Sequence, residues 1–321
     1  MIELPALPYG EWRNTRDTLH RWLQIVGKVR LALTPLINHW WNVPFYVSAR
    51  GFTTSAITVG DRTFEIEFDF VDDVLRIQPH GAAARTVELA PRSVADFYAA
   101  TMAALRAAGI ECKIWTTPVE ILDDRTPFDH DTAHHAYDKR YVLRFWDSVS
   151  RIAGVLTKFR ANFIGKCSPV HFFWGSMDLA VTRFSGRRAP PIEGTIMERE
   201  GYSHELSSVG WWPGDKRLER AAFYSYASPE PQGFAIASVA PEYAYYYAPL
   251  RGFYLDHDDV RRAEDPESVL LAFCESTYEA AAELGNWPRG ELEREEHHGE
   301  LFSSGDHRQR SGADEGLRGM P

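Results

Sequence analysis

Side chains that can carry out acid–base or nucleophilic chemistry are concentrated in one segment, residues 168–187. Its polar members alternate with large aromatic residues in a pattern typical of a strand, in which neighbours point to opposite faces. The candidates in this segment are His171, Trp174, Ser176, Asp178 and Arg183. Burying such polar groups without partners is costly, so we expect them to lie in a cleft or to be paired.

Two further polar clusters could join this segment. One is Tyr202-Ser203-His204-Glu205, and the other surrounds His39, Trp41 and Arg50. We expect a pocket with aromatic walls where two lobes meet, in which these side chains gather within ~10 Å. The candidate ligand-binding residues are His39, Trp41, Arg50, His171, Trp174, Ser176, Asp178, Arg183, His204 and Glu205. The sequence assigns no catalytic residue among them.

Other interpretations of the same residues stay open. Ser176, His171 and Asp178 could form a nucleophilic triad, although strand neighbours seldom have that geometry. A metal ion could be held by His171 and Asp178 together with His204 and Glu205. Each residue could also be purely structural, for example through an ion pair between Asp178 and a neighbouring arginine.

Standard cofactor and nucleophile motifs are absent from the sequence. There is no G-x-S-x-G nucleophile elbow, and no G-x-G-x-x-G follows a strand. Gly27-Lys28 and Gly165-Lys166 lack the first glycine of a phosphate loop. His130 and His134 have the spacing of a zinc helix, but their polar surroundings favour a loop. The cofactor therefore stays unknown, and no dedicated metal site is predicted.

The composition limits the classes of partner. Asp and Glu outnumber Lys and Arg by 45 to 35, the formal net charge is −10, and no basic cluster stands out in the sequence. Nucleic acids and anionic membranes attract basic surfaces, so neither is expected as a partner. Three scattered cysteines favour a reducing compartment, and the first residues do not resemble a signal peptide. We expect a soluble cytoplasmic protein whose oligomeric state the sequence does not determine.

Hydrophobic periodicity predicts an α+β fold with two similar lobes, each a mainly antiparallel sheet packed with long helices. Helices are expected over residues 14–33, 94–108, 138–163 and 266–284. Strands are expected over residues 63–70, 74–78, 113–117, 170–174, 178–184, 202–209 and 222–227, with shorter extended segments at 45–49 and 52–58. The first lobe covers 1–125, the second 126–290, and the polar residues 291–321 are predicted to be a disordered acidic tail. The order helix, strands, helix occurs twice, so the lobes could stem from an internal duplication and be related by a pseudo-twofold axis.

Several long segments together resemble one uncharacterised bacterial family, catalogued as domain of unknown function 5996. They are residues 18–28, 38–41, 168–187, 202–205, 223–226 and 229–231. The resemblance extends from about Leu4 to Trp287 and leaves out the tail. It implies no activity, cofactor or catalytic residue.

The sequence thus leaves three functions open. The leading hypothesis is a protein that binds a small polar molecule in an aromatic-walled pocket between the lobes, as a binding protein or as an enzyme. The second is a non-catalytic scaffold or protein-interaction module, for which we expect an exposed apolar patch at Trp211-Trp212 or at residues 243–247. The third is a metal-dependent hydrolase, which requires at least three His, Asp or Glu side chains at ligand distances.

Overall fold

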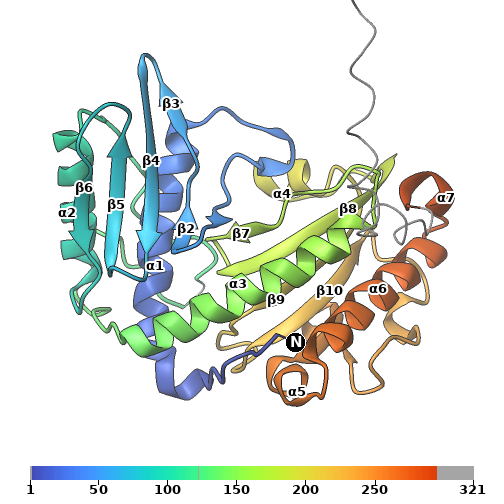
Figure 1. Ribbon diagram of the computed structural model, residues 1–321. Helices are drawn as coiled ribbons and strands as arrows, with labels where there is room; N and C mark the ends of the chain where they lie inside the picture. Colours follow the sequence, from blue (N-terminus) through green and yellow to red (C-terminus); the bar gives the residue numbers. More distant parts are fainter. Residues whose placement is uncertain (1, 122, 295–321) are drawn as a thin grey trace, which may run out of the picture.

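The computed structural model describes residues 2–121 and 123–294. Within them the chain forms two antiparallel sheets and a set of helices that cover them (Figure 1). The helices are α1 (Tyr9–Leu33), α2 (Val94–Ala107), α3 (Lys139–Ala161), α4 (Ile196–Gly201), α5 (His257–Arg262), α6 (Pro266–Leu284) and α7 (Arg289–Leu292), with short 3-10 turns η1 (Asn38–Trp40), η2 (Phe234–Ile236) and η3 (Ala248–Leu250). This is the expected α+β class with two lobes.

The first sheet contains six strands. They are β1 (Tyr46–Val47), β2 (Gly51–Thr53), β3 (Ile57–Val59), β4 (Arg62–Asp69), β5 (Val74–Pro79) and β6 (Arg85–Glu88), in the order β1-β2-β4-β5-β6 with β3 also paired to β4. Phe64, Ile66 and Phe68 of β4 are buried, whereas the intervening acids lie on the other face. The buried face packs against α1 and α2, where Trp22 stacks on Phe97 with ring centroids 4.5 Å apart.

The second sheet also contains six strands, in the order β11-β12-β10-β9-β8-β7. They are β7 (His171–Phe173), β8 (Asp178–Arg188), β9 (His204–Trp212), β10 (Ala222–Ser228), β11 (Tyr245–Tyr247) and β12 (Gly252–Asp256). Helices α3 and α6 cover one face, which carries Leu179, Val181 and Trp211 (Figure 1). The strand register places Asp178, Tyr224 and Tyr226 on the opposite face, which no long helix of residues 2–121 and 123–294 covers. We call this opposite face the polar face.

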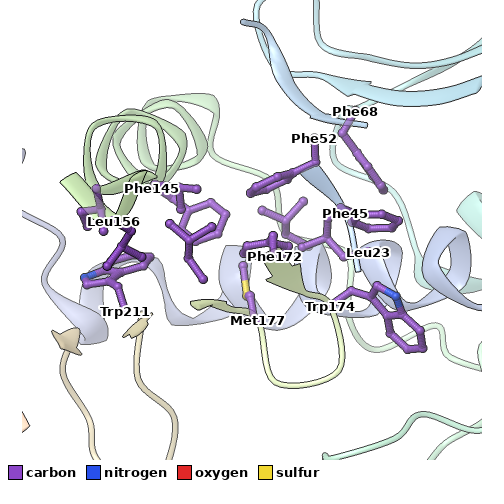
Figure 2. Close-up of a cluster of buried hydrophobic side chains, with 14 of the residues drawn as sticks. Leu23, Phe45, Phe52, Phe68, Phe145, Leu156, Phe172, Trp174, Met177 and Trp211 are labelled. Atoms are coloured by element: carbon purple, nitrogen blue, oxygen red, sulfur yellow. The ribbon is translucent and has the colours of Figure 1, made fainter. Parts of the chain in front are cut away.

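One continuous cluster of buried side chains joins the two lobes. Phe172 of β7 stacks on Phe52 of β2 with ring centroids 4.0 Å apart, and Phe145 of α3 lies beside both rings (Figure 2). The backbones of Phe45 and Phe172 also exchange two hydrogen bonds of 2.9 Å. The lobes therefore share a core, and the expected boundary at residue 125 falls in the irregular connection between α2 and α3. That boundary, the internal duplication and the pseudo-twofold axis stay predictions.

The structure differs from two expectations about secondary structure, the strand at residues 113–117 and the start of the tail at residue 291. Residues 113–117 form no strand, because their carbonyls at Trp115 and Thr117 accept hydrogen bonds from Lys28 instead of pairing with another strand. Residues 289–292 form the short helix α7, and Leu292 is buried against Gly165, so residues 291–294 of the expected tail belong to the described fold. The rest of the expected tail lies outside the described residues.

The starts of two predicted helices, at residues 94 and 266, are confirmed. Ser93 caps α2 by accepting from the Asp96 amide, and Asp265 caps α6 by accepting from the Ser268 amide, with Pro266 at the first position. His130–His134 forms no helix. No helix in the described residues combines the length and the apolar character needed to cross a membrane.

Candidate functional site

A cleft of about 650 Å³ lies between the first helix and one end of the second sheet. Its walls come from residues 13–21 of α1, the connecting segment around 120–136, Ser176 in the turn between β7 and β8, and residues 212–217 after β9. Most lining side chains are charged or hydrogen-bonding, so the cleft suits a polar ligand.

A stripe of buried polar residues on α1 positions the loops that line the cleft. Arg16, His20, Gln24 and Lys28 follow one another at four-residue spacing, which places them on one face of a helix. Arg16 donates to the carbonyl of Gly214, and the ring Nε2 of His20 lies 2.8 Å from the carbonyl oxygen of Gly175. The stripe therefore contacts both the β7–β8 turn and the loop after β9.

Gln24 and Lys28 hold the connecting segment in the same way. Gln24 Nε2 donates to the carbonyl of Val119 at 2.8 Å, while its Oε1 accepts from the amide of Val119 at 2.9 Å. Lys28 donates to the carbonyls of Trp115, at 3.0 Å, and Thr117. These contacts fix the backbone immediately before Glu120, and so fix the place of its carboxyl.

Glu120 lines the cleft, and Asp178 lies just behind the lining residue Ser176. Glu120 faces the cleft and lies close against the backbone of Gly175, where a side chain would overlap it. Asp178 accepts hydrogen bonds from the hydroxyl of Ser176, at 2.7 Å, and from that of Tyr224. Ser176 also lies beside Glu120 and links the two acids. The site is thus a row of oxygen groups.

A glycine permits the contact between Tyr224 and Asp178. Gly210 pairs with Tyr224 across β9 and β10, and a Cβ at position 210 would overlap the Tyr224 ring and hydroxyl. The ring therefore lies across the bare backbone of β9 to reach β8. Tyr224 also stacks on Tyr226, whose hydroxyl is 3.4 Å from that of Tyr202. Aromatic rings with polar tips consequently cover the polar face beside the acids.

The environment of both acids favours their neutral forms. Glu120 is reached by solvent from the cleft but is otherwise enclosed by protein, and this enclosure raises its pKa, with the charge of Asp178 adding to the rise. Burial likewise raises the pKa of Asp178, although the hydroxyls of Tyr224 and Ser176 act in the opposite direction. Perturbed acids that face each other in a cleft are common at functional sites.

The backbone supports this assignment. Glu120 has φ of 57° and Met177, in the β7–β8 turn, has φ of 64°, in the left-handed region that side chains other than glycine rarely occupy. Such conformations cost roughly 1–3 kcal/mol each and are concentrated at binding and catalytic sites. Here they occur on the two segments that present the acids.

The other charges of the cleft are already paired. Arg21 lies 3.1 Å from Asp131, Arg217 lies 2.7 Å from Asp215, and Lys216 pairs with Asp123. In contrast, neither Glu120 nor Asp178 forms an ion pair with any described residue. Glu120 and the adjoining Asp178 are therefore the acids at the cleft that have no ion-pair partner among the described residues, although the charge of Arg217 acts on Glu120.

The structure does not gather the ten candidate residues into one pocket. Ser176 lines the cleft, and Asp178 adjoins it. His39, Trp41, His171 and His204 form a separate cluster, in which Trp41 lies between His39 and His171 with ring centroids 5.5 and 6.0 Å away.

The remaining four candidates have structural partners. Arg50 pairs with Asp69 of the first sheet at 2.6 Å. Arg183 lies on the face covered by α3 and α6, where it contacts Glu275. The ion pair between Asp178 and an arginine that the sequence allowed therefore does not form with Arg183. The indole of Trp174 donates to the carbonyl of Val43 at 2.7 Å, and the carboxylate of Glu205 accepts from Ser185 and Arg187.

Sequence reasoning missed Glu120 and the polar stripe of α1. Glu120 lies among apolar residues with no motif around it, and its role depends on a contact with a turn more than fifty residues away. The stripe did carry a signal, because its polar residues recur every four positions along one face of the helix.

The described residues bear on two other hypotheses from the sequence, the metal site and the exposed apolar patch. No group of three or more His, Cys, Asp or Glu side chains in residues 2–121 and 123–294 is placed to hold a metal ion. Trp211 and Trp212 are buried, with 0% and 6% exposure, so they do not form the apolar patch that the scaffold hypothesis expected. In the 243–247 run, Tyr243 is 48% exposed.

Comparison with known proteins gives one match. A family model described as a family of unknown function, DUF5996, matches residues 4–294 and so covers both sheets and the cleft. No curated protein matches the chain, and no solved structure matches it.

Proposed function

The chain belongs to the DUF5996 family, and we propose that it binds a small polar molecule in the cleft through a positively charged group placed on Glu120 and Asp178. An amine or a guanidinium group has the required chemistry. It supplies hydrogen-bond donors and positive charge to two acids that lack a cationic partner among the described residues. The uncompensated carboxyl pair is the observation that carries this proposal.

The physical reason is electrostatic. Two carboxylates held close together repel each other, which favours either the retention of a proton or the binding of a cation. Hydrogen bonds to charged groups are stronger than those between neutral groups, particularly where water is partly excluded. A ligand cation would therefore replace the retained proton and lower the raised pKa of Glu120 and of Asp178.

The tyrosines beside the acids support the same ligand class. The rings of Tyr224 and Tyr226 stack with centroids 6.2 Å apart, and Trp212 lines the cleft next to Ser176. Aromatic faces attract cations, with energies of about 0.5–2 kcal/mol according to exposure. The combination of carboxyls and aromatic faces favours an organic cation over a neutral polar molecule.

A second candidate function is acid–base catalysis on the bound molecule. The observation that favours it is the raised pKa of both acids, because a rise in pKa brings a carboxyl closer to the range in which it can donate a proton to a substrate. In this role Glu120 faces the ligand as proton donor, and Asp178 holds the hydroxyls of Ser176 and Tyr224 in place.

We also propose that the protein acts in the cytoplasm. The described cysteines, Cys112, Cys167 and Cys274, are all free, which fits a reducing compartment.

A thermal-shift measurement with small cations tests the binding proposal. Ethylamine, guanidinium, putrescine and spermidine are compared with uncharged ethylene glycol at matched ionic strength. A ligand at ~100 times its dissociation constant stabilises the folded state by about 2.7 kcal/mol, which raises the melting temperature by roughly 5 °C. We expect such a rise for at least one organic cation and none for the glycol.

Glu120→Gln supplies the site-specific comparison, because it removes the charge and keeps the size of the side chain. The matched control is Glu88→Gln, an exposed acid on the first sheet. We expect Glu120→Gln to abolish the shift and Glu88→Gln to retain it. Equal shifts in the two variants, or no cation that shifts the wild type, would overturn the proposal.

A further inference from the structure

A second group of polar side chains lies at the other end of the polar face, where η1 and α4 meet β8 and β9. It contains Lys166, His39 and His204, packed on the rings of Phe184 and Trp41. Phe184 lies six residues beyond Asp178 on β8, which corresponds to about 20 Å along an extended strand. This group is therefore separate from the cleft and independent of the function proposed for it.

Hydrogen bonds fix the orientation of His39. Its Nδ1 lies 3.0 Å from the carbonyl oxygen of Gly201, so Nδ1 carries the hydrogen. In the neutral ring Nε2 is then an acceptor, and Lys166 Nζ donates to it at 2.6 Å. The His204 ring stands edge-on to His39 with centroids 5.5 Å apart. Three nitrogen bases thus converge within a few ångströms.

Aromatic rings hold the lysine in place. Lys166 Nζ is 4.9 Å from the centroid of Phe184 and 5.7 Å from that of Trp41. Cation–π contacts of this kind orient the ammonium group but supply no counter-charge. The ammonium group keeps further N–H donors for another acceptor.

Positive charge is in excess around this group. Lys166 forms no ion pair with any described residue, and Glu200 is the acid that faces it, while Glu200 itself accepts from the backbone amide of His39 at 3.4 Å. Arg188 adds a further positive charge beside His204. Such an excess stands out in a protein with a net charge of −10.

The positive region continues behind Trp41. His171 is fully buried there, and both of its ring nitrogens lack a hydrogen-bond partner in the described structure. Arg30, which is 7% exposed, and Arg160 both lie close enough to lower the pKa of His171. Neither arginine forms an ion pair with a described residue.

We propose that Lys166, His39 and His204 form a binding site for an oxyanion of the phosphate class. An oxyanion would accept hydrogen bonds from Lys166 Nζ and from the protonated imidazoles and would supply the missing negative charge. A free phosphate ion and a phosphate group on a larger molecule present the same chemistry to these three side chains.

The titration behaviour of the group agrees with this site. Burial lowers the pKa of His39, Lys166 and His204, and for both histidines the positive charge of Lys166 adds to the decrease. A bound anion acts in the opposite direction and favours the protonated imidazoles. Binding at neutral pH is therefore coupled to proton uptake.

Calorimetric titration of the full chain with inorganic phosphate tests the site. We expect saturable binding at pH 7 whose heat depends on the ionisation enthalpy of the buffer, in the direction of proton uptake. Lys166→Gln should weaken phosphate binding at least tenfold. The control Lys158→Gln, which removes an exposed lysine of α3 that pairs with Glu267, should leave binding unchanged.

Three results would overturn the proposal. They are the absence of saturable phosphate binding in the wild type, equal weakening by the two lysine variants, and binding without proton uptake. If Lys166→Gln lowers the melting temperature of the free protein, His204→Gln replaces it, with an expected loss of at least threefold in affinity. Unchanged affinity in a folded His204→Gln variant would contradict the site as well.

Discussion

At the residue scale, the chemistry of the cleft depends on which groups surround Glu120 and Asp178. The two acids have hydroxyls, glycine backbone and a tyrosine ring as direct contacts, and Arg217 acts on Glu120 through its charge without forming an ion pair. The other charged residues of the cleft are compensated by nearby partners. A ligand that brings its own positive charge would complete this arrangement.

A substitution at Gly210, on the strand next to Tyr224, would break the contact between Tyr224 and Asp178. In Gly210→Ala the new Cβ would overlap the Tyr224 ring, which must turn away from Asp178. We expect a loss of stability of about 1–3 kcal/mol, as for other overpacked sites, together with weaker binding of organic cations. Urea denaturation and the thermal-shift measurement check the two effects. An unchanged cation shift would show that Tyr224 does not contribute to the site.

His171 makes stability depend on pH. Burial lowers its pKa from 6.5 to about 3, so between these values the unfolded chain binds more protons than the folded one. Stability is then complete above pH 6.5 and decreases as the pH falls towards 3.

The variant His171→Leu isolates this effect. It removes two buried nitrogens without partners, so we expect stability at pH 7 to be unchanged or increased. Between pH 6.5 and 4 the wild type should lose about 3 kcal/mol more than the variant. Urea denaturation at both pH values measures the difference. Parallel losses in the two proteins would assign the acid sensitivity to other groups, such as His20, whose pKa burial lowers to about 4.

At the scale of elements, α1 is the helix that assembles the cleft. Its apolar repeat was sufficient to predict the helix from the sequence, and the caps of α2 and α6 gave their starts correctly. Its polar stripe could not be assigned a role, because α1 is buried on nearly every side and local periodicity does not show what covers each side. The three segments that the stripe holds are distant in the sequence.

Gln24 gives a direct test of that assembly. Gln24→Ala would leave the amide and carbonyl of Val119 without their partners. We expect a loss of roughly 1–3 kcal/mol in the free energy of unfolding, the usual cost of unsatisfied buried groups, and a weaker cation shift because Glu120 is released. Gln78→Ala, an exposed position on β5, is the control. A fully retained cation shift would contradict the positioning role of α1.

At the scale of the whole molecule, the two sheets and their helices share one hydrophobic cluster (Figure 2). The sequence predicted the number and kind of lobes because strand alternation and helix periodicity are local. It did not predict how the ten candidate residues divide between two sites and several structural contacts. That division depends on strand register and on which face of the second sheet α3 and α6 cover.

Phe172 tests whether the lobes unfold together. It is fully buried and stacks on Phe52 of the other sheet. Phe172→Ala should lower the free energy of unfolding by about 3–5 kcal/mol, and circular dichroism and tryptophan fluorescence should still report one coincident transition. Two separate transitions in the wild type, with only one shifted by the substitution, would show that the lobes are independent.

The most direct test of the central claim is the pKa of the Glu120 carboxyl, measured by carbon-detected NMR titration of the free protein. The account predicts a pKa above the ordinary value of 4.5, and a decrease towards that value in Asp178→Asn, where the neighbouring charge is absent. A pKa at or below 4.5 that Asp178→Asn leaves unchanged would mean that the two acids are neither uncompensated nor coupled. In that case the carboxyl pair would not be the cation-binding element of the cleft.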